Sequence, residues 1–464
     1  MGTTSRRLPV FDRRRAGVLL HPTALPAEGG AFGAAGRAFI DWLSRAGFSV
    51  WQMLPLGPVT ESRSPYWTRS DFALDARFID CTETADPEQQ HAAFNAFRES
   101  NELWLEDYAL FVALGEECNG AAWWDWPAPL RERDRAALEL ARQRLAPRLV
   151  QLRTEQWHAA SQLAALREYA QQREVRLFGD LPFYVAPDSA TAWAHREQFQ
   201  LTETGRPALL AGVPPDYFSA DGQLWGYPVY DWKQAQYDHF AFWRMRLRVQ
   251  LTRFDLLRID HFRGLVDYWA VPPDAADARI GAWHTTPGRA LLETLRQDWP
   301  DLPLVAEDLG SINEAVETLR RDFGLPGMRV LQFAFDGSPG NPHLPHNIGR
   351  GAVAYTGTHD NDTTLGWYRA QDDAARQRVD FLLRSDWLPM PEALLRAALA
   401  SPASLAVIPV QDLLGLGSEA RSNTPGTASG NWQWKLWHGA LDDGLAGWCR
   451  ALNQAYGRDL HTSA

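Results

Sequence analysis

Short apolar runs recur along the chain, and a polar or Gly/Pro-rich segment follows each one. Continuous runs of about four to eight apolar residues predict strands that are buried on both faces. Segments with helical spacing, such as 162–172 and 312–323, lie between several of the runs. Strands that alternate with helices predict a parallel sheet with crossover connections. The eight runs are residues 17–21, 50–55, 176–180, 255–260, 304–307, 328–333, 353–357 and 405–409.

Eight such strands favour an α/β fold of the closed (β/α)8 or TIM-barrel type, with residues 1–464 as a single barrel domain. An open doubly wound sheet is the structural alternative. The GxGxxG fingerprint of a dinucleotide-binding sheet is absent, because Gly29, Gly30 and Gly33 have the wrong spacing. Residues 80–160 have helical spacing and predict a helical insertion. Residues 185–240 are rich in Gly, Pro and Tyr without clear periodicity, and they predict a loop insertion that forms a lid over the barrel mouth.

Composition narrows the class of function. The net charge of −11 argues against a nucleic-acid partner, and no apolar stretch is long enough to predict a membrane span. Residues 1–15 lack the apolar core of a secretory signal. Cys81, Cys118 and Cys449 lie far apart without CxxC spacing, which disfavours a disulfide framework or a zinc site and suits a reducing, cytoplasmic location.

Tryptophan is unusually frequent, with 21 residues. A flat aromatic face suits the apolar C–H face of a sugar ring. Core packing is the more common role for any single tryptophan. The total nevertheless favours a protein that binds carbohydrate.

Acidic residues end several of the predicted strands, where a barrel enzyme has its active site. They are Asp180, Asp260, Glu307 and, after the seventh run, Asp360. A single acid of this kind is commonly a helix cap or a salt-bridge partner. We adopt that structural interpretation for Asp308, which should face away from Glu307. Several acids at one end of a barrel predict a catalytic site.

Strand alternation gives two of these acids different surroundings. Arg258 and Asp260 share one face, and a neighbouring arginine favours an ionised carboxylate. Glu307 points inward with Val305, and apolar neighbours raise the pKa of a glutamate. One ionised carboxylate and one protonated acid are what cleavage of a glycosidic bond with retained configuration requires.

Other chemistries lack support. His261 and His359 flank the acids and suit hydrogen bonding to sugar hydroxyls or capping, but no HxH or HExxH spacing predicts a metal site. The phosphate-binding GxxxxGK[ST] loop and the GxSxG elbow are also missing. Acid–base chemistry on a glycoside needs no cofactor, so we expect none.

The sequence resembles the amylomaltase or disproportionating-enzyme family, the 4-α-glucanotransferases of glycoside hydrolase family 77. The similarity runs through about residues 16–437 in a fixed order. The matching segments are GVLLHPT at 17–23, WQMLPLGP at 51–58, SPY at 64–66, GDLPFYV at 179–185, GVPPDYFS at 212–219, GQLWG at 222–226, RIDHFRG at 258–264, AEDLG at 306–310, THDND at 358–362, NTPGT at 423–427 and NW at 431–432.

The resemblance implies a role for each matching residue. Asp260 would be the nucleophile, Glu307 the general acid/base, and Asp360 the carboxylate that stabilises the transition state. The implied substrate-binding residues are Ser64, Tyr66, Asp180, Tyr217, Phe218, Gln223, Trp225, Arg258, His261, His359 and Asn431.

The resemblance further implies an enzyme that transfers α-1,4-glucan segments between maltooligosaccharides and glucans, acting as a monomer or a weak homo-oligomer. An α-glucan hydrolase and a catalytically inactive glucan-binding protein are the alternatives. The three carboxylates argue against the second. Some segments depart from the family's pattern: Trp67 stands where Gln commonly follows Ser-Pro-Tyr, and Tyr227 stands where Asn is common in Trp-Gly-Asn-Pro. The resemblance therefore does not extend to the residues of the outer sugar subsites.

Overall fold

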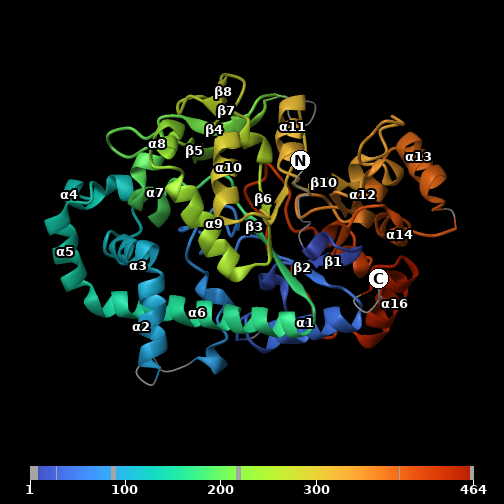
Figure 1. Cartoon of the computed structure of the whole chain (residues 1–464), viewed down its shortest axis with the longest axis horizontal. Coiled ribbons are helices and arrows are strands. Elements are labelled where there is room, and N and C mark those ends of the chain that lie inside the picture. The colour runs from blue at the N-terminus through green and yellow to red at the C-terminus, as the bar shows by residue number, and fades with distance from the viewer. Residues whose placement is uncertain (1–8, 28, 85–89, 216–220, 386, 460–464) are drawn as a thin grey trace.

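The computed structural model describes residues 9–27, 29–84, 90–215, 221–385 and 387–459. Eight of its strands close into a barrel in the order β1-β12-β11-β10-β9-β6-β3-β2, and all neighbours are parallel (Figure 1). Each of the eight predicted runs overlaps one strand, so the predicted (β/α)8 barrel is confirmed. The strands are β1 (Arg15–Leu19), β2 (Val50–Gln52), β3 (Arg176–Leu181), β6 (Leu256–Ile259), β9 (Leu304–Ala306), β10 (Gly327–Val330), β11 (Ala352–Tyr355) and β12 (Leu405–Pro409).

Alternation along the strands divides their side chains between two cores. Inward-facing residues fill the barrel with apolar side chains, whereas their neighbours pack against the surrounding helices. On β6, Leu256 faces inward and Leu257 and Ile259 face outward. Arg258 and the residue that follows the strand, Asp260, are therefore aimed at the barrel axis. The inner core includes Val50, Phe178, Leu256, Val305, Val330, Val353, Leu405 and Val407.

Amphipathic helices cover the outside of the barrel. On α1, Phe39, Ile40, Trp42 and Leu43 are buried while the opposite face is solvated. Residues 331–351, between β10 and β11, contain only short 3-10 turns, so this crossover lacks an α-helix. No helix within the described residues is long and apolar enough to cross a membrane. The covering helices are α1 (Ala34–Arg45), α9 (Ala241–Arg253), α10 (Gly288–Asp298), α11 (Glu314–Asp322), α12 (Thr364–Ala370), α13 (Asp373–Leu383), α14 (Glu392–Ala400) and α16 (Asp443–Ala455).

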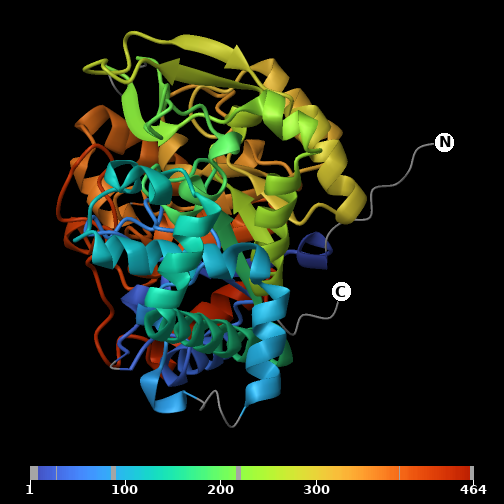
Figure 2. The same ribbon diagram turned by 90° about the vertical axis from the view of Figure 1, so that its left-hand side faces the viewer.

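The segment that follows β2 forms a layer of helices on one side of the barrel. Figure 2 is turned so that this layer faces the viewer. Aromatic side chains join it to the next segment, since Trp193 packs 6.0 Å from Phe111 and 5.6 Å from Trp126 between ring centroids. Its helices are α2 (His91–Ser100), α3 (Glu102–Glu117), α4 (Ala128–Arg131), α5 (Arg135–Arg144) and α6 (Ala146–Gln172).

The segment 185–240 contains more regular structure than the loop that its sequence suggested. It contributes two strands to a four-stranded antiparallel sheet of order β5-β4-β7-β8, whose other strands come from the chain after β6. The central pairing, between β4 and β7, joins residues far apart in the sequence, so no local periodicity predicts it. The segment contains α7 (Ala190–Ala194), β4 (Leu210–Val213), β5 (Gln223–Pro228) and α8 (Trp232–Tyr237). The two later strands of the sheet are β7 (Asp267–Val271) and β8 (Ala282–Thr285).

Asp308, which follows Glu307, ties β9 to β10. Its Oδ1 accepts a 2.7 Å hydrogen bond from the Met328 backbone N–H. Its Oδ2 lies 3.0 Å from an Arg329 nitrogen and 3.2 Å from an Arg320 nitrogen. The side chain is only 2% exposed. This contact is the structural salt bridge that the sequence predicted for Asp308.

Replacing Asp308 with alanine should lower the free energy of unfolding by about 3 kcal/mol, because two partly buried arginines lose their shared partner. Chemical denaturation measures the change. The exposed Asp301 offers a matched control, and Asp301→Ala should alter stability by less than about 0.5 kcal/mol. Equal effects of the two substitutions would contradict the structural role of Asp308.

Candidate active site

A cleft of about 1470 Å³ opens at the carboxyl ends of the barrel strands. That volume exceeds the roughly 300–1,000 Å³ of sites that hold one small ligand, and it suits an oligomeric one. Most tryptophans pack in the cores, as expected for any single one, but three line the cleft. The lining residues include Tyr66, Tyr184, Trp225, Tyr227, Arg258, Asp260, His261, Trp283, Glu307, Asp360 and Trp432.

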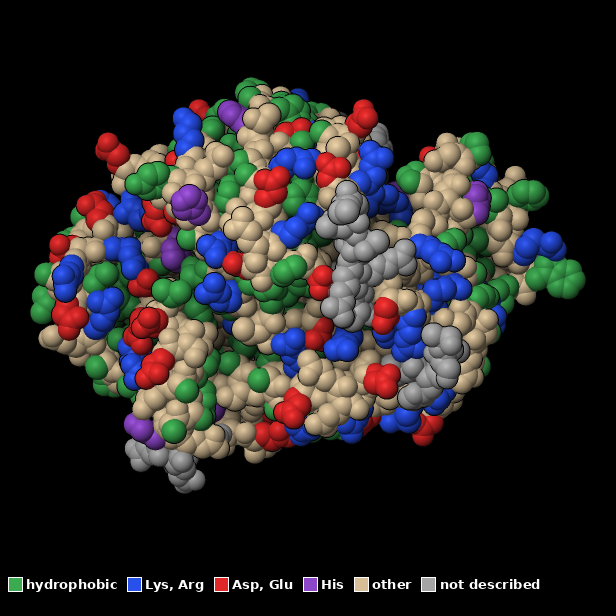
Figure 3. Space-filling model, viewed as in Figure 1, with side chains coloured by type: hydrophobic (Ala, Val, Ile, Leu, Met, Phe, Trp, Pro, Cys, Tyr) green, Lys and Arg blue, Asp and Glu red, His purple; other side chains and the backbone are tan. Residues whose placement is uncertain are grey.

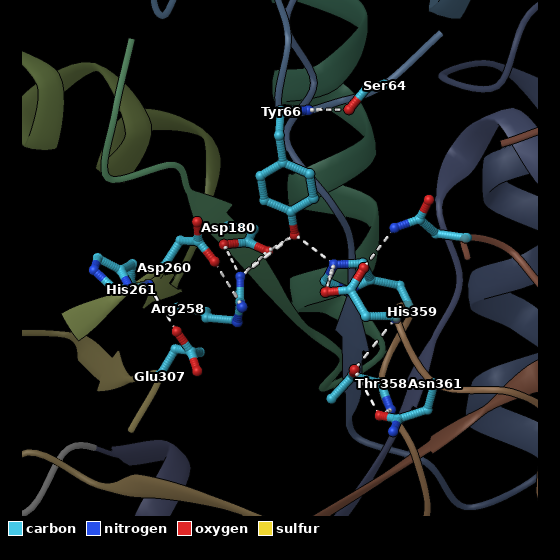
Figure 4. A network of polar contacts seen from close by, with 12 residues as sticks. Ser64, Tyr66, Asp180, Arg258, Asp260, His261, Glu307, Thr358, His359 and Asn361 are labelled. Carbon is cyan, nitrogen blue, oxygen red and sulfur yellow. Dashed lines mark hydrogen bonds and ion pairs between the residues drawn. The ribbon is translucent and has the colours of Figure 1, made fainter. Parts of the chain in front are cut away.

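Arg258 joins two carboxylates at the floor of the cleft (Figure 4). One guanidinium nitrogen donates to both oxygens of Asp180, at 2.8 and 2.7 Å. The other nitrogen lies 2.8 Å from Oδ1 of Asp260. The Asp180 side chain is fully buried, whereas that of Asp260 is 29% exposed to the cleft. Asp260 is therefore an oriented carboxylate that a ligand in the cleft can reach.

Tyr66 links this ion-pair group to the opposite wall. Its hydroxyl donates to Oδ2 of Asp180 at 2.6 Å. Because that bond uses its single hydrogen, the oxygen accepts from Nε2 of His359, 3.0 Å away. The rings of Tyr66 and His359 also stack, with centroids 5.3 Å apart. The loop after β2 thus connects the ends of β3 and β11.

Glu307 follows β9 and is held by backbone donors. Its Oε2 accepts from the His261 N–H at 2.8 Å, and its Oε1 accepts from the Leu309 N–H at 3.0 Å. Burial, reinforced by the negative charge of Asp260, raises the pKa of Glu307 to about 8, although Arg258 and the two N–H groups oppose the shift. The side chain therefore carries a proton at neutral pH.

His261 adopts a left-handed backbone conformation, with φ of 46° and ψ of 52°. This conformation is uncommon for a residue other than glycine, and here it aims the His261 N–H at Glu307. Burial lowers the pKa of the imidazole to about 4, so the ring is neutral at pH 7. The Trp225 ring stands edge-on to it, with centroids 4.8 Å apart. His261 and Trp225 together form an uncharged wall beside Glu307.

Asp360 stands on the opposite side, on the loop after β11. Nε2 of His359 lies 3.2 Å from its Oδ2, and Nδ2 of Asn423 donates to its Oδ1 at 2.7 Å. Burial opposes ionisation, but His359 and these hydrogen bonds outweigh burial, and the pKa of Asp360 lies below its ordinary value. Asp360 is thus an ionised carboxylate aimed at the cleft.

Comparison with known proteins identifies the family. A sequence model of the 4-alpha-glucanotransferase family matches residues 20–90 and 81–439. The chain is 43% identical to a 4-alpha-glucanotransferase of Thermus thermophilus, over 95% of this chain and 98% of that one. It is 42% identical to the corresponding protein of Synechocystis sp., over 97% and 99% of the two chains. The chain belongs to the 4-alpha-glucanotransferase family.

Solved structures agree with this membership. Amylomaltase from Streptococcus agalactiae in complex with acarbose superposes with a TM-score of 0.91 at 31% identity, covering 96% of this chain and 100% of that one. Amylomaltase from Corynebacterium glutamicum, at 18% identity and a TM-score of 0.75, shares the fold over 96% of this chain and 75% of that one. The sequence resemblance to this family is therefore confirmed.

The remaining predicted site residues of this 4-alpha-glucanotransferase family member fall into three groups. Ser64 and Gln223 line the cleft, and Oγ of Ser64 accepts from the Tyr66 N–H at 3.3 Å. Asn431 also lines the cleft and closes the loop 424–431, because its Oδ1 accepts from the Thr424 N–H at 2.9 Å. Tyr217 and Phe218 lie outside the described residues.

Two residues that hold Asp360 were missing from the prediction. Asn423 bonds its carboxylate, and a terminal nitrogen of Arg421 donates to its backbone carbonyl oxygen at 2.8 Å. Both are more than 60 positions away in the chain. The resemblance of the segment 423–427 to the family could have indicated Asn423, but no local pattern points to Arg421. Within the described ranges, no group of three or more His, Cys, Asp or Glu side chains could hold a metal ion.

The raised pKa of Glu307 predicts a pH-dependent stability. A folded-state pKa near 8 and an ordinary value of 4.5 mean that the stabilising contribution is complete below pH 4.5 and is lost as the pH rises through 8. Glu307→Gln removes this titration. The unfolding midpoint of the variant should therefore rise relative to that of the wild type between pH 5 and pH 9.

Thermal unfolding at several pH values measures this difference. Glu293→Gln, at an exposed position on α10, is the matched control and should follow the wild type throughout. A constant difference between Glu307→Gln and the wild type would show that Glu307 ionises normally in the folded protein.

Proposed function

We propose that this enzyme transfers α-1,4-glucan segments between maltooligosaccharides by a double displacement with retained configuration. Glu307 protonates the oxygen of the bond to be cut while Asp260 attacks the anomeric carbon. The reducing-end fragment leaves, and the glycosyl group remains bound to Asp260 as an ester. The 4-hydroxyl of a second glucan, deprotonated by Glu307, then displaces Asp260. The proton that Glu307 gave to the leaving group is thus recovered from the acceptor.

The observation that supports this proposal most strongly is the contrast between Asp260 and Glu307. Asp260 is paired with Arg258 at 2.8 Å, as an anionic nucleophile requires. Glu307 accepts only backbone N–H groups among the described residues and keeps a proton to about pH 8, as a general acid requires. Asp360, ionised and open to the cleft, would stabilise the positive charge that develops on the sugar.

A sugar hydroxyl can end the cycle in place of water if the cleft is covered. Gln223, Trp225 and Tyr227 of β5 line the cleft beside Glu307 and Tyr66. We propose that the segment 185–240 acts in this way as a cover over the reacting bond, which favours a bound acceptor over bulk water. The substrate-binding roles of Ser64, Asp180, His261, His359 and Asn431 belong to the same proposal.

We also propose a cytoplasmic location and a monomer or weak homo-oligomer. All three cysteines are unpaired thiols, which suits a reducing compartment. On the face in Figure 3, basic and acidic side chains are interspersed, which does not favour binding to a polyanion.

Incubation with maltotriose tests the activity. A transferase should produce glucose together with oligosaccharides longer than maltotriose, whereas a hydrolase produces only glucose and maltose. Product chromatography separates the two outcomes. Absence of any product longer than maltotriose would favour the hydrolase.

The nucleophile is tested by Asp260→Asn. Loss of the attacking carboxylate should lower kcat at least about 1,000-fold, while maltooligosaccharide binding measured by calorimetry persists. Asp274→Asn removes an exposed acid outside the cleft and should leave kcat unchanged. Turnover of Asp260→Asn within about tenfold of the wild type would refute the assignment.

A further inference from the structure

Strand β5 lies along the cleft between His261 on one side and the loop that carries Tyr66 on the other. Alternate residues of a strand share a face, and Gln223, Trp225 and Tyr227 all line the cleft. Trp225 stands against His261, beside the proposed acid. Tyr227, two residues further along, reaches the loop that carries Tyr66. One short strand therefore contacts both His261 and the Tyr66 loop.

Tyr227 contacts the loop that carries Tyr66 through its hydroxyl and through its ring. Its hydroxyl donates to the Tyr66 carbonyl oxygen at 3.0 Å. Its ring lies 4.9 Å from the Trp67 ring and stacks nearly parallel to Tyr184 at 6.0 Å, between centroids. Burial raises the pKa of Tyr227 well above its usual range, so the hydroxyl stays a donor at any working pH.

Backbone hydrogen bonds close the loop around Tyr66, from the Trp67 N–H to the Ser64 carbonyl oxygen at 3.1 Å and from the Arg69 N–H to the Pro58 carbonyl oxygen at 2.7 Å. Residues 53–75 contain no helix or strand beyond the isolated bridge between Val59 and Thr68. At Tyr66 itself, both backbone groups bond side chains. The Tyr66 N–H donates to Oγ of Ser64, and the Tyr227 hydroxyl donates to the Tyr66 carbonyl oxygen. The Tyr66 hydroxyl must nevertheless sit within hydrogen-bond distance of both Asp180 and His359. The position of Tyr66 therefore depends in part on the two side chains that bond its backbone.

We propose that Tyr227 is a positioning residue for the reaction and acts through Tyr66. The Tyr227 hydroxyl fixes the Tyr66 carbonyl, and the ring contact with Trp67 fixes the next residue. Together they set the Tyr66 hydroxyl between the Asp180–Arg258–Asp260 group and the His359–Asp360 pair. This inference rests on the proposed transfer reaction, which gives those carboxylates their roles.

Tyr227→Phe tests the proposal because it keeps the ring and removes only the hydroxyl. Loss of one hydrogen bond should lower kcat on maltotriose about 3- to 10-fold. KM should stay within about twofold, and the unfolding midpoint within about 3 °C. Tyr237→Phe, 82% exposed on α8, is the matched control and should leave kcat unchanged. An unchanged kcat for Tyr227→Phe, or a change in KM alone, would overturn the proposal.

A double-mutant cycle with Tyr66→Phe shows whether Tyr227 acts through Tyr66. The assay is fluoride release from α-maltosyl fluoride, whose leaving group needs no protonation, so slow variants stay measurable. Tyr227→Phe should have no further effect once the Tyr66 hydroxyl is gone. Effects that multiply independently would overturn the proposal. Maltotriose conversion by the wild type decides the proposed function separately, since the role of Tyr227 is judged only from variant-to-wild-type ratios.

Discussion

The buried guanidinium of Arg258 is the constraint on which the catalytic end of the barrel depends. Only 5% of Arg258 is exposed, and an unpaired charge at that depth would cost several kcal/mol. Asp180, from the neighbouring strand, and Asp260, from its own strand, supply the compensating charge. The pairing orients the Asp260 carboxylate toward the cleft. Glu307, which follows the other neighbouring strand, stays protonated because burial and the negative charge of Asp260 raise its pKa.

A second connection extends this arrangement across the barrel mouth. The Tyr66 hydroxyl contacts both Asp180 and His359, and His359 contacts Asp360. The proposed nucleophile and the proposed stabilising carboxylate are therefore held by one continuous network. A displacement of Tyr66 would loosen both sides together. Tyr227 of β5, which bonds the Tyr66 carbonyl oxygen, is proposed to affect both sides in this way.

The sequence predicted the barrel because each strand is a short apolar run and helical segments separate several of them, and it predicted the strand-end acids because parallel strands end together. It did not predict the four-stranded sheet, since β5 mixes polar, aromatic and glycine residues and the central pairing of the sheet, between β4 and β7, joins residues far apart in the chain. Asn423 and Tyr227 were missed as positioning residues for the same reason: their contacts, with Asp360 and Tyr66, span 63 and 161 positions. Local pattern encodes burial but not such long-range contacts.

Covalent trapping tests the central claim, that Asp260 forms a glycosyl-enzyme, most directly. In Glu307→Gln, α-maltotriosyl fluoride can still react with Asp260, because fluoride leaves without an acid, but no general base remains to activate the acceptor. Intact-mass measurement should show one added maltotriosyl group, and peptide mapping should place it on Asp260. A label on Asp360, or no label while fluoride is released, would contradict the mechanism.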